Sequence, residues 1–221
     1  MNINEIYISL SGEPDGFNNQ GGLTTFVRLQ GCNLACSWCD TTRAMDTDLK
    51  CVDMTVDEVV RQCTTKHVVI TGGEPLQQMN EVKLLVDRLT SVNRSREARQ
   101  FVTIETNGSI DITIDPARTK YQFLRFVVDY KLDSSGMNQA MSPVIFQHLY
   151  SLDVIKFVLK DLQDYRQARE VIFKYPEWRA KKVFSPIVGG VWATRLAERM
   201  LEDQLEGVTL SLQLHKQLGL R

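Results

Sequence analysis

Apolar residues along this chain fall into short runs that are separated by polar and turn-forming residues. Most runs are rich in Val, Ile, Phe and Thr, and several alternate apolar with polar positions, which is typical of β-strands. We therefore expect strands at residues 5–10, 24–30, 67–71, 101–105, 125–130, 153–160, 182–186 and 208–216.

A second pattern, with apolar residues at helical spacing, occupies several intervals between these runs. Thr55 and Glu58 form a capping box, which predicts that a helix begins there. The same helical pattern covers residues 80–89, 164–174 and 194–205. Strands that alternate with helices predict an α/β fold with a mostly parallel sheet and helices outside it. Because no repeat or Pro/Gly cluster divides the chain, we expect a single domain over residues 1–221.

Three motifs directly follow predicted strands. The segment GCNLACSWCD at 31–40 follows the strand at 24–30, GGEP at 72–75 follows the strand at 67–71, and ETNG at 105–108 closes the strand at 101–105. Ligands bind at the carboxyl ends of the strands in parallel sheets. We therefore expect these loops to form one site.

The composition restricts the classes of ligand. The 221 residues are 43% apolar and 24% charged, with a formal net charge of −1, so neither nucleic acid nor an anionic membrane is indicated as a partner. The first residues lack a basic stretch followed by an apolar run, and no segment approaches the roughly 18 apolar residues of a membrane span. We expect a cytoplasmic protein with a small-molecule site.

Three of the five cysteines form a compact Cys-x3-Cys-x2-Cys loop at Cys32, Cys36 and Cys39. Three thiolates can hold a cubane iron–sulfur cluster and leave one iron open to a chelating cofactor. A structural zinc site is the alternative, but zinc usually takes four protein ligands and no nearby group completes the set. Cys51 and Cys63 stand apart and are interpreted as small apolar filler.

Polar residues near the cysteine loop add further candidates. Asp40 and Thr41 offer the hard oxygen ligands that Mg²⁺ prefers, although such a pair can also cap a helix. In the turn at 71–75, Glu74 can accept from a cofactor amine, or the turn can simply join a strand to a helix. Alternation along 24–30 points Arg28 into the concave side of the sheet, toward an anionic ligand or a core acid.

The last predicted strand, at 208–216, alternates leucines with polar residues that include Gln213 and His215. That polar face is either solvated or closes one side of the site.

Together the motifs GCNLACSWCDT, VVITGGEP, IETNG, SLSGE and LQLHKQLGLR resemble the 7-carboxy-7-deazaguanine synthases, which are radical S-adenosylmethionine enzymes of queuosine and deazapurine biosynthesis. The resemblance implies a partial, reduced (β/α)6 barrel with a [4Fe-4S] cluster, S-adenosylmethionine and Mg²⁺. The implied reaction converts 6-carboxy-5,6,7,8-tetrahydropterin to 7-carboxy-7-deazaguanine and ammonia, after the reduced cluster cleaves S-adenosylmethionine to a 5′-deoxyadenosyl radical. A homodimer and a flavodoxin or ferredoxin reductant are also implied. Use of the product in tRNA modification or in a secondary metabolite stays open.

The same resemblance assigns residues. The cluster ligands match Cys32, Cys36 and Cys39, and the Mg²⁺ ligand matches Thr41, with Asp40 as a second candidate. Cofactor contacts match Gly73, Glu74, Asp129, Tyr130, Lys131, Ser134, Ser185, Pro186, Ile187 and Val188. Substrate contacts match Leu10, Ser11, Gly12, Glu13, Arg28, Thr71, Gln213, His215 and Arg221.

Two positions depart from the family pattern. Ser11 stands where the family commonly has Gln, and Asp133 stands where many members have Pro. Neither departure touches the cluster or the metal. Two alternatives remain: a glycyl-radical-enzyme activase, which shares the cysteine spacing, and a binding module for iron–sulfur or zinc without catalysis.

Overall fold

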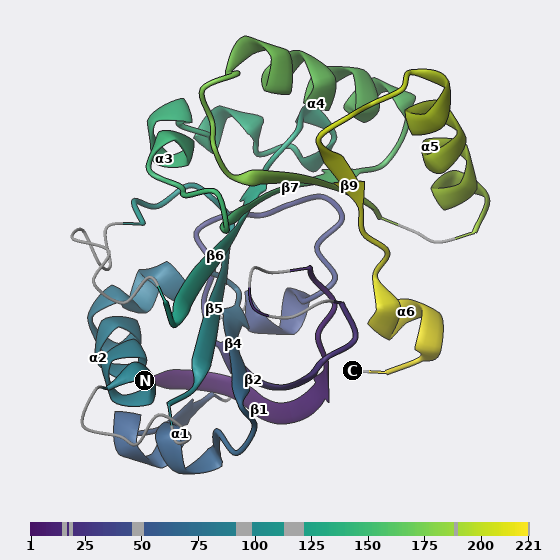
Figure 1. Ribbon diagram of the computed structural model, residues 1–221. Helices are drawn as coiled ribbons and strands as arrows, with labels where there is room; N and C mark the ends of the chain where they lie inside the picture. The colour runs from purple at the N-terminus through teal and green to yellow at the C-terminus, as the bar shows by residue number, and fades with distance from the viewer. Residues whose placement is uncertain are drawn as a thin grey trace.

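The computed structural model describes residues 1–14, 17, 20–45, 51–91, 99–112, 122–187 and 190–220, except the side chain of His215. At its centre is a single sheet in the order β3-β1-β2-β4-β5-β6-β7-β8-β9. Figure 1 shows that the sheet curves, with helices on its outside. In the described part of the chain, no helix is both long and apolar enough to cross a membrane.

The strands coincide closely with the apolar runs. Their bounds are β1 Asn2–Leu10, β2 Leu23–Leu29, β3 Val52–Asp53, β4 His67–Gly72, β5 Phe101–Thr106, β6 Leu124–Tyr130, β7 Val154–Leu159, β8 Lys181–Pro186 and β9 Val208–Leu210. β1 pairs antiparallel with β2 and β3, whereas every neighbouring pair from β2 to β9 is parallel. The predicted α/β fold with a mostly parallel, partial barrel is thereby confirmed.

Helices cover the outer face of the sheet. On that face lie α1 Val56–Gln62, α2 Met79–Thr90, α3 Pro143–Gln147, α4 Leu162–Lys174 and α5 Val191–Glu202, and the chain also forms α6 Leu214–Leu218 near its end. The capping box at α1 is present, because Thr55 Oγ1 accepts from Glu58 N and Glu58 Oε2 accepts from Thr55 N. α6 lies apart from the other helices, at the open side of the curve (Figure 1).

The core lies between the sheet and its outer helices. α2 contributes Val82, Leu85, Val86 and Leu89, which are buried against the strands. Full burial of a side chain of this kind stabilises a fold by about 1.5–3 kcal/mol. This packing fixes the strands, and with them the loops at their carboxyl ends.

The expected strand over 208–216 is wrong beyond its first residues. β9 ends at Leu210, and α6 occupies the segment that should have continued it. The last backbone hydrogen bond between β8 and β9 runs from Ser211 N to Phe184 O. The next bond would need an N–H donor at Pro186, and because proline has none, the ladder stops there. The chain then turns toward the β1–β2 hairpin. The short elements β3, α3 and α6 were not expected from the sequence.

Candidate active site

A pocket of about 460 Å³ opens at the carboxyl ends of the parallel strands. It brings together motifs that are far apart in the sequence, as expected. Of the residues proposed from the sequence, the pocket is lined by Leu10, Gly12, Glu13, Arg28, Cys32, Cys36, Cys39, Asp40, Thr41, Thr71, Gly73, Asp129, Lys131, Ile187 and Gln213.

The cysteine loop is held on one side by the GGEP turn. Glu74 N donates to Gly31 O at 2.7 Å, and Gly31 N donates to Ala44 O at 2.7 Å. A Cβ at Gly73 would lie 2.1 Å from Gly31 O, so only glycine permits this approach of the two backbones. The glycines of this turn therefore pack the cysteine loop against β4, whether or not a ligand is bound.

On its other side the cysteine loop docks on the turn that follows β6. Ser37 N donates to Ser135 O at 3.0 Å, and Ser37 Oγ donates to Ser134 O at 2.7 Å. Trp38 Nε1 lies 3.4 Å from Ser134 Oγ, and Lys131 Nζ lies 5.4 Å from the centre of the Trp38 ring. The loop is thus fixed by strands from both halves of the sheet.

The three thiols of the loop are free and partly buried. Burial raises the pKa of Cys32 and of Cys36, and the charge of Lys131 opposes this shift at Cys36. In the described part of the chain, no three His, Cys, Asp or Glu side chains surround a point where a single metal ion could lie. The three thiols line one pocket, and three thiolates are a ligand set that can hold an iron–sulfur cluster with one iron left open.

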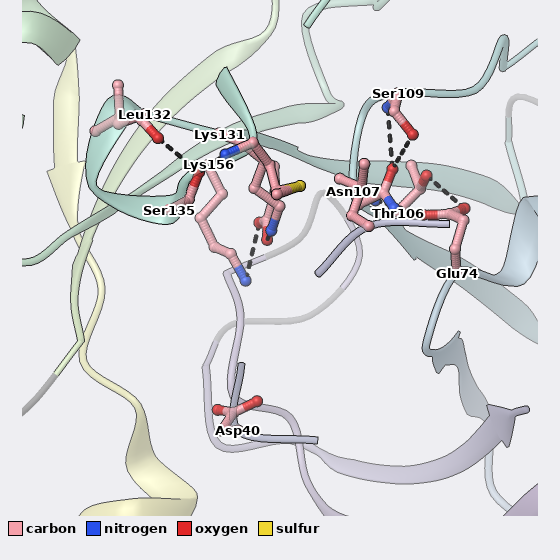
Figure 2. Close-up of polar contacts among 12 residues, drawn as sticks. Asp40, Glu74, Thr106, Asn107, Ser109, Lys131, Leu132, Ser135 and Lys156 are labelled. Carbon is pink, nitrogen blue, oxygen red and sulfur yellow. Dashed lines mark hydrogen bonds and ion pairs between the residues drawn. The ribbon is translucent and has the colours of Figure 1, made fainter. Parts of the chain in front are cut away.

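Glu74 lies behind the pocket rather than in it. The residue is fully buried, and its carboxylate accepts from Thr106 Oγ1 at 2.8 Å, Asn107 N at 2.7 Å and Leu76 N at 2.9 Å. Figure 2 shows Glu74 facing Thr106 and Asn107. This arrangement does not support the expected contact with a cofactor amine. Glu74 instead joins the GGEP turn to the end of β5.

Arg28 points into the pocket, as the alternation along β2 predicted. Its Nε donates to Glu5 Oε1 at 2.9 Å, and its Nη2 donates to Tyr7 OH at 2.9 Å. Its Nη1 lies 3.4 Å from Thr41 Oγ1. The guanidinium therefore has the partly buried carboxylate of Glu5 as a partner and still borders the space where a ligand would lie.

Four charged side chains form a row on another wall of the pocket, and we call Glu13, Lys156, Asp129 and Lys131 the charge row. Lys156 Nζ lies 3.0 Å from Glu13 Oε1 and 3.2 Å from Asp129 Oδ1. Lys131 Nζ lies 2.6 Å from Asp129 Oδ2. Burial raises the pKa of Glu13 to about 7, against the opposing charge of Lys156.

Several pocket residues were missed by the sequence analysis. Lys156 lies within the apolar run of β7, and a lone lysine in a buried strand was the available signal. Glu105 begins the ETNG motif, which was expected at the site although this residue was given no role of its own. Burial raises the pKa of Glu105, although Lys156 and a hydrogen bond from Thr71 oppose the shift. Further lining residues that the sequence analysis did not propose include Tyr7, Arg43, Lys216 and Leu220.

Other proposed residues lie outside the pocket lining. Tyr130 packs in the core against Phe146, Phe157 and Trp178, so its ring points away from the site. Three residues are held in turns or in the strand behind it: Ser134, Ser185 and Pro186. Val188, Arg221 and the side chain of His215 lie outside the described residues.

The two departures from the family pattern have local explanations. Ser11 is buried, and its Oγ donates to Glu13 O at 3.0 Å, so the hydroxyl holds the turn after β1. Asp133 N donates to Gln167 Oε1 at 3.0 Å, a bond that proline at this position could not make. Both residues stabilise loops beside the pocket.

Comparisons with known proteins identify the family to which this chain belongs. A sequence profile of the radical SAM superfamily matches residues 26–134. The chain is 35% identical over 222 residues to 7-carboxy-7-deazaguanine synthase from Clostridium acetobutylicum, covering 96% of this chain and 93% of the relative. It is 37% identical over 223 residues to the synthase of the same name from Methanospirillum hungatei, covering 100% of this chain and 86% of the relative.

A solved structure agrees on the fold. QueE from Escherichia coli superposes with a TM-score of 0.70 at 21% identity, covering 96% of this chain and 93% of that chain. At this identity the likeness supports the architecture alone, whereas the sequence relatives show the family. This chain is therefore an enzyme that belongs to the 7-carboxy-7-deazaguanine synthase family of the radical SAM superfamily.

Proposed function

We propose that this enzyme converts 6-carboxy-5,6,7,8-tetrahydropterin to 7-carboxy-7-deazaguanine, with release of ammonia. One observation carries the proposal: the same pocket is lined by the three cysteines of the loop and by the Glu13 and Arg28 side chains. The cysteines can hold the radical-generating group, and the charged side chains can bind a ligand with both a carboxylate and N–H donors.

For the cofactors, we propose that Cys32, Cys36 and Cys39 hold a [4Fe-4S] cluster. The proposed contacts with S-adenosylmethionine come from Gly73 and from the segments at 129–131 and 185–188. A reduced cluster held there would supply the electron for reductive cleavage of S-adenosylmethionine, and the cofactor would supply the radical chemistry on the substrate. The chain's part is to hold the two molecules together and to exclude water from them.

For the substrate, Arg28 is proposed to bind the carboxylate, because a guanidinium can donate two parallel hydrogen bonds to it. Glu13 Oε2 is buried and has no hydrogen-bond partner among the described residues, so it can accept from the guanidine-like N–H groups of the pterin. Gln213 Oε1 is unpaired in the same sense and borders the pocket. Leu10, Gly12 and Thr71 complete this side.

Mg²⁺ is proposed to bind at Thr41, next to Arg28. Thr41 Oγ1 lies 3.1 Å from Asp40 Oδ1, and the other oxygen of Asp40 lies 2.9 Å from Lys216 Nζ. Burial opposes the shift, but Lys216 lowers the pKa of Asp40, so this group stays a carboxylate. These oxygens suit Mg²⁺, which commonly takes one or two protein ligands and completes its shell with substrate and water. Loss of Mg²⁺ stimulation in Thr41→Ala would support the assignment, and undiminished stimulation would contradict it.

Four further properties are proposed on the family resemblance. The reductant is a flavodoxin or a ferredoxin, the assembly is a homodimer, the location is the cytoplasm, and the product belongs to queuosine or deazapurine biosynthesis. Size-exclusion chromatography coupled to light scattering tests the second of these directly.

The deciding experiment is anaerobic reconstitution with iron and sulfide, followed by incubation with reductant, S-adenosylmethionine, Mg²⁺ and 6-carboxytetrahydropterin. We expect 7-carboxy-7-deazaguanine, detected by chromatography and mass spectrometry. Cys36→Ala should abolish it, and Cys51→Ala, a cysteine outside the loop, should not. Cleavage of S-adenosylmethionine without deazaguanine would reject the substrate, whereas no cleavage at all would reject the cluster assignment.

A further inference from the structure

Lys156 is a charged residue in an otherwise apolar strand. β7 has the sequence VIKFVL, and its remaining residues are buried. The parallel register with β6 places Asp129 beside Lys156, and the loop after β1 brings Glu13 to the other side of the same ammonium group. The side chain is 12% exposed, so the ammonium group has left most of its water for these two carboxylates.

The contacts of Lys156 extend in both directions. Glu13, at one end of the charge row, is the proposed acceptor for the substrate. Asp129 and Lys131, at the other end, are proposed cofactor contacts, and Lys131 also lies over the Trp38 ring of the cysteine loop. Lys156 is therefore the group that joins the two proposed binding regions. Figure 2 shows Lys156 and Lys131 on the same side of the pocket, with Asp40 of the cysteine loop apart from them.

The charges explain why the row must remain intact. Burial would lower the pKa of Lys156, but Asp129, Glu13 and Glu105 hold it well above its usual range. Burial likewise opposes ionisation of Asp129, but Lys131 and Lys156 hold its pKa below its usual range. A buried charge that loses its partner is strongly destabilising, so each member depends on its neighbour.

The two oxygens of Glu13 have different tasks. Oε1 contacts Lys156 at 3.0 Å, whereas Oε2 is buried without a partner in the described part of the chain. A ligand that donates to Oε2 would fix the carboxylate, and through Oε1 it would fix Lys156 and Asp129. Once one ligand has ordered these side chains, a second ligand that contacts them loses less conformational entropy when it binds.

We propose that Lys156 is a positioning residue that couples the two half-sites, so that a ligand at Glu13 strengthens the binding of S-adenosylmethionine at Asp129 and Lys131. The coupling is reciprocal, because each ligand changes the affinity of the other by the same factor. This inference rests on the proposed function, which supplies the identity of both ligands.

The test is equilibrium binding to the anaerobically reconstituted enzyme without reductant, so that no turnover occurs. Isothermal titration gives the Kd of S-adenosylmethionine with and without saturating 6-carboxytetrahydropterin. We expect a ratio of about tenfold in the wild type, within the usual range of such couplings. In Lys156→Met the ratio should fall to within about twofold of one. Lys160→Met, an exposed lysine just beyond the same strand, should keep the full ratio.

The ratio of the two Kd values separates a positioning role from a merely structural one. General damage to the fold would weaken the binding of S-adenosylmethionine equally with and without the pterin, and the ratio would not change. If Lys156→Met does not fold, Lys156→Gln keeps a hydrogen-bond donor without the charge and should also lose the ratio, whereas Lys156→Arg should retain most of it. A tenfold ratio that persists in Lys156→Met or Lys156→Gln overturns the coupling alone. A wild type that does not bind the pterin overturns the proposed function, and the coupling with it.

Discussion

Two buried cations face the same pocket from distant strands, Arg28 on β2 and Lys156 on β7, and they are held in different ways. Arg28 donates hydrogen bonds to the Glu5 carboxylate and to the Tyr7 phenol, and both residues lie on the adjacent strand β1, where Glu5 is directly opposite Arg28. Lys156 contacts the Asp129 carboxylate on β6 and the Glu13 carboxylate in the loop after β1, and Glu13 lies 143 positions away from it along the chain. Arg28 is therefore part of a local unit, whereas Lys156 depends on the assembled barrel.

The largest expected effect is at the locally held cation. Arg28→Ala removes the proposed carboxylate ligand, takes away the donor of Tyr7, and leaves Glu5 with the exposed Arg43 in place of its more buried partner. Loss of one partner from a buried, hydrogen-bonded charge pair costs about 2–5 kcal/mol. We expect kcat/KM for the pterin to fall by about 10²- to 10³-fold, while 5′-deoxyadenosine still forms. Steady-state kinetics with both products measured checks this.

Arg43→Ala is the matched control for Arg28, because Arg43 contacts the same Glu5 oxygen but is 54% exposed. An exposed pair contributes little, so the change in kcat/KM should stay below about threefold. Equal losses in both variants would mean that Glu5, and not the substrate, accounts for the role of Arg28.

The next effect is on stability and concerns a carboxylate that lies behind the pocket. Glu74→Gln would place an amide NH₂ where the buried carboxylate now accepts from Thr106 and Asn107. An unsatisfied buried group costs about 1–3 kcal/mol, and urea denaturation should show a loss of that size. Glu81→Gln, on the exposed face of α2, should lie within about 0.5 kcal/mol of the wild type. A stable Glu74→Gln with weakened cofactor binding would instead restore Glu74 as a ligand.

Much of this architecture was readable from the sequence, and the exceptions have physical causes. Arg28 was placed correctly because β2 alternates, and alternation decides which face a side chain occupies. Lys156 was missed because β7 is apolar on both faces, and its partners come from β6 and from the loop after β1. The end of β9 was missed for the same reason, since it depends on Pro186 in another strand. Local pattern finds strands and motifs, but not the partners that folding brings together.

A smaller effect is expected on the pH dependence of stability. It should differ between Glu13, which pairs with Lys156, and Glu5, which pairs with Arg28. Burial raises the pKa of Glu13 from 4.5 to about 7, so the stability it contributes is present below about pH 4.5 and is lost as the pH rises to about 7. Burial opposes the shift at Glu5, but Arg43 and Arg28 lower its pKa. Glu5 therefore stabilises the fold at a pH above its usual pKa of 4.5, and this stabilisation is lost as the pH falls through its lowered pKa in the folded protein.

Denaturation of both glutamine variants across this pH range measures the contrast. Relative to the wild type, Glu13→Gln should gain about 1–3 kcal/mol between pH 4.5 and 7, since one pKa unit corresponds to about 1.4 kcal/mol. Glu5→Gln should lose stability relative to the wild type as the pH rises from below 4.5. Parallel curves for the two variants would show that both acids lie in the same electrostatic environment, and the comparison would fail.

The smallest effect is expected at a third cation, Lys216 of α6. Like Lys156 it borders the pocket, and its Nζ lies 2.9 Å from Asp40 Oδ2, but the two side chains are 38% and 47% exposed. Exposed ion pairs contribute about 0–1 kcal/mol and are screened by salt. Lys216→Ala should therefore change kcat/KM by less than about threefold, and any change should shrink in high salt. A tenfold loss that persists in high salt would place α6 in the binding site itself, and burial would then no longer separate the cations that hold ligands from those that only cover them.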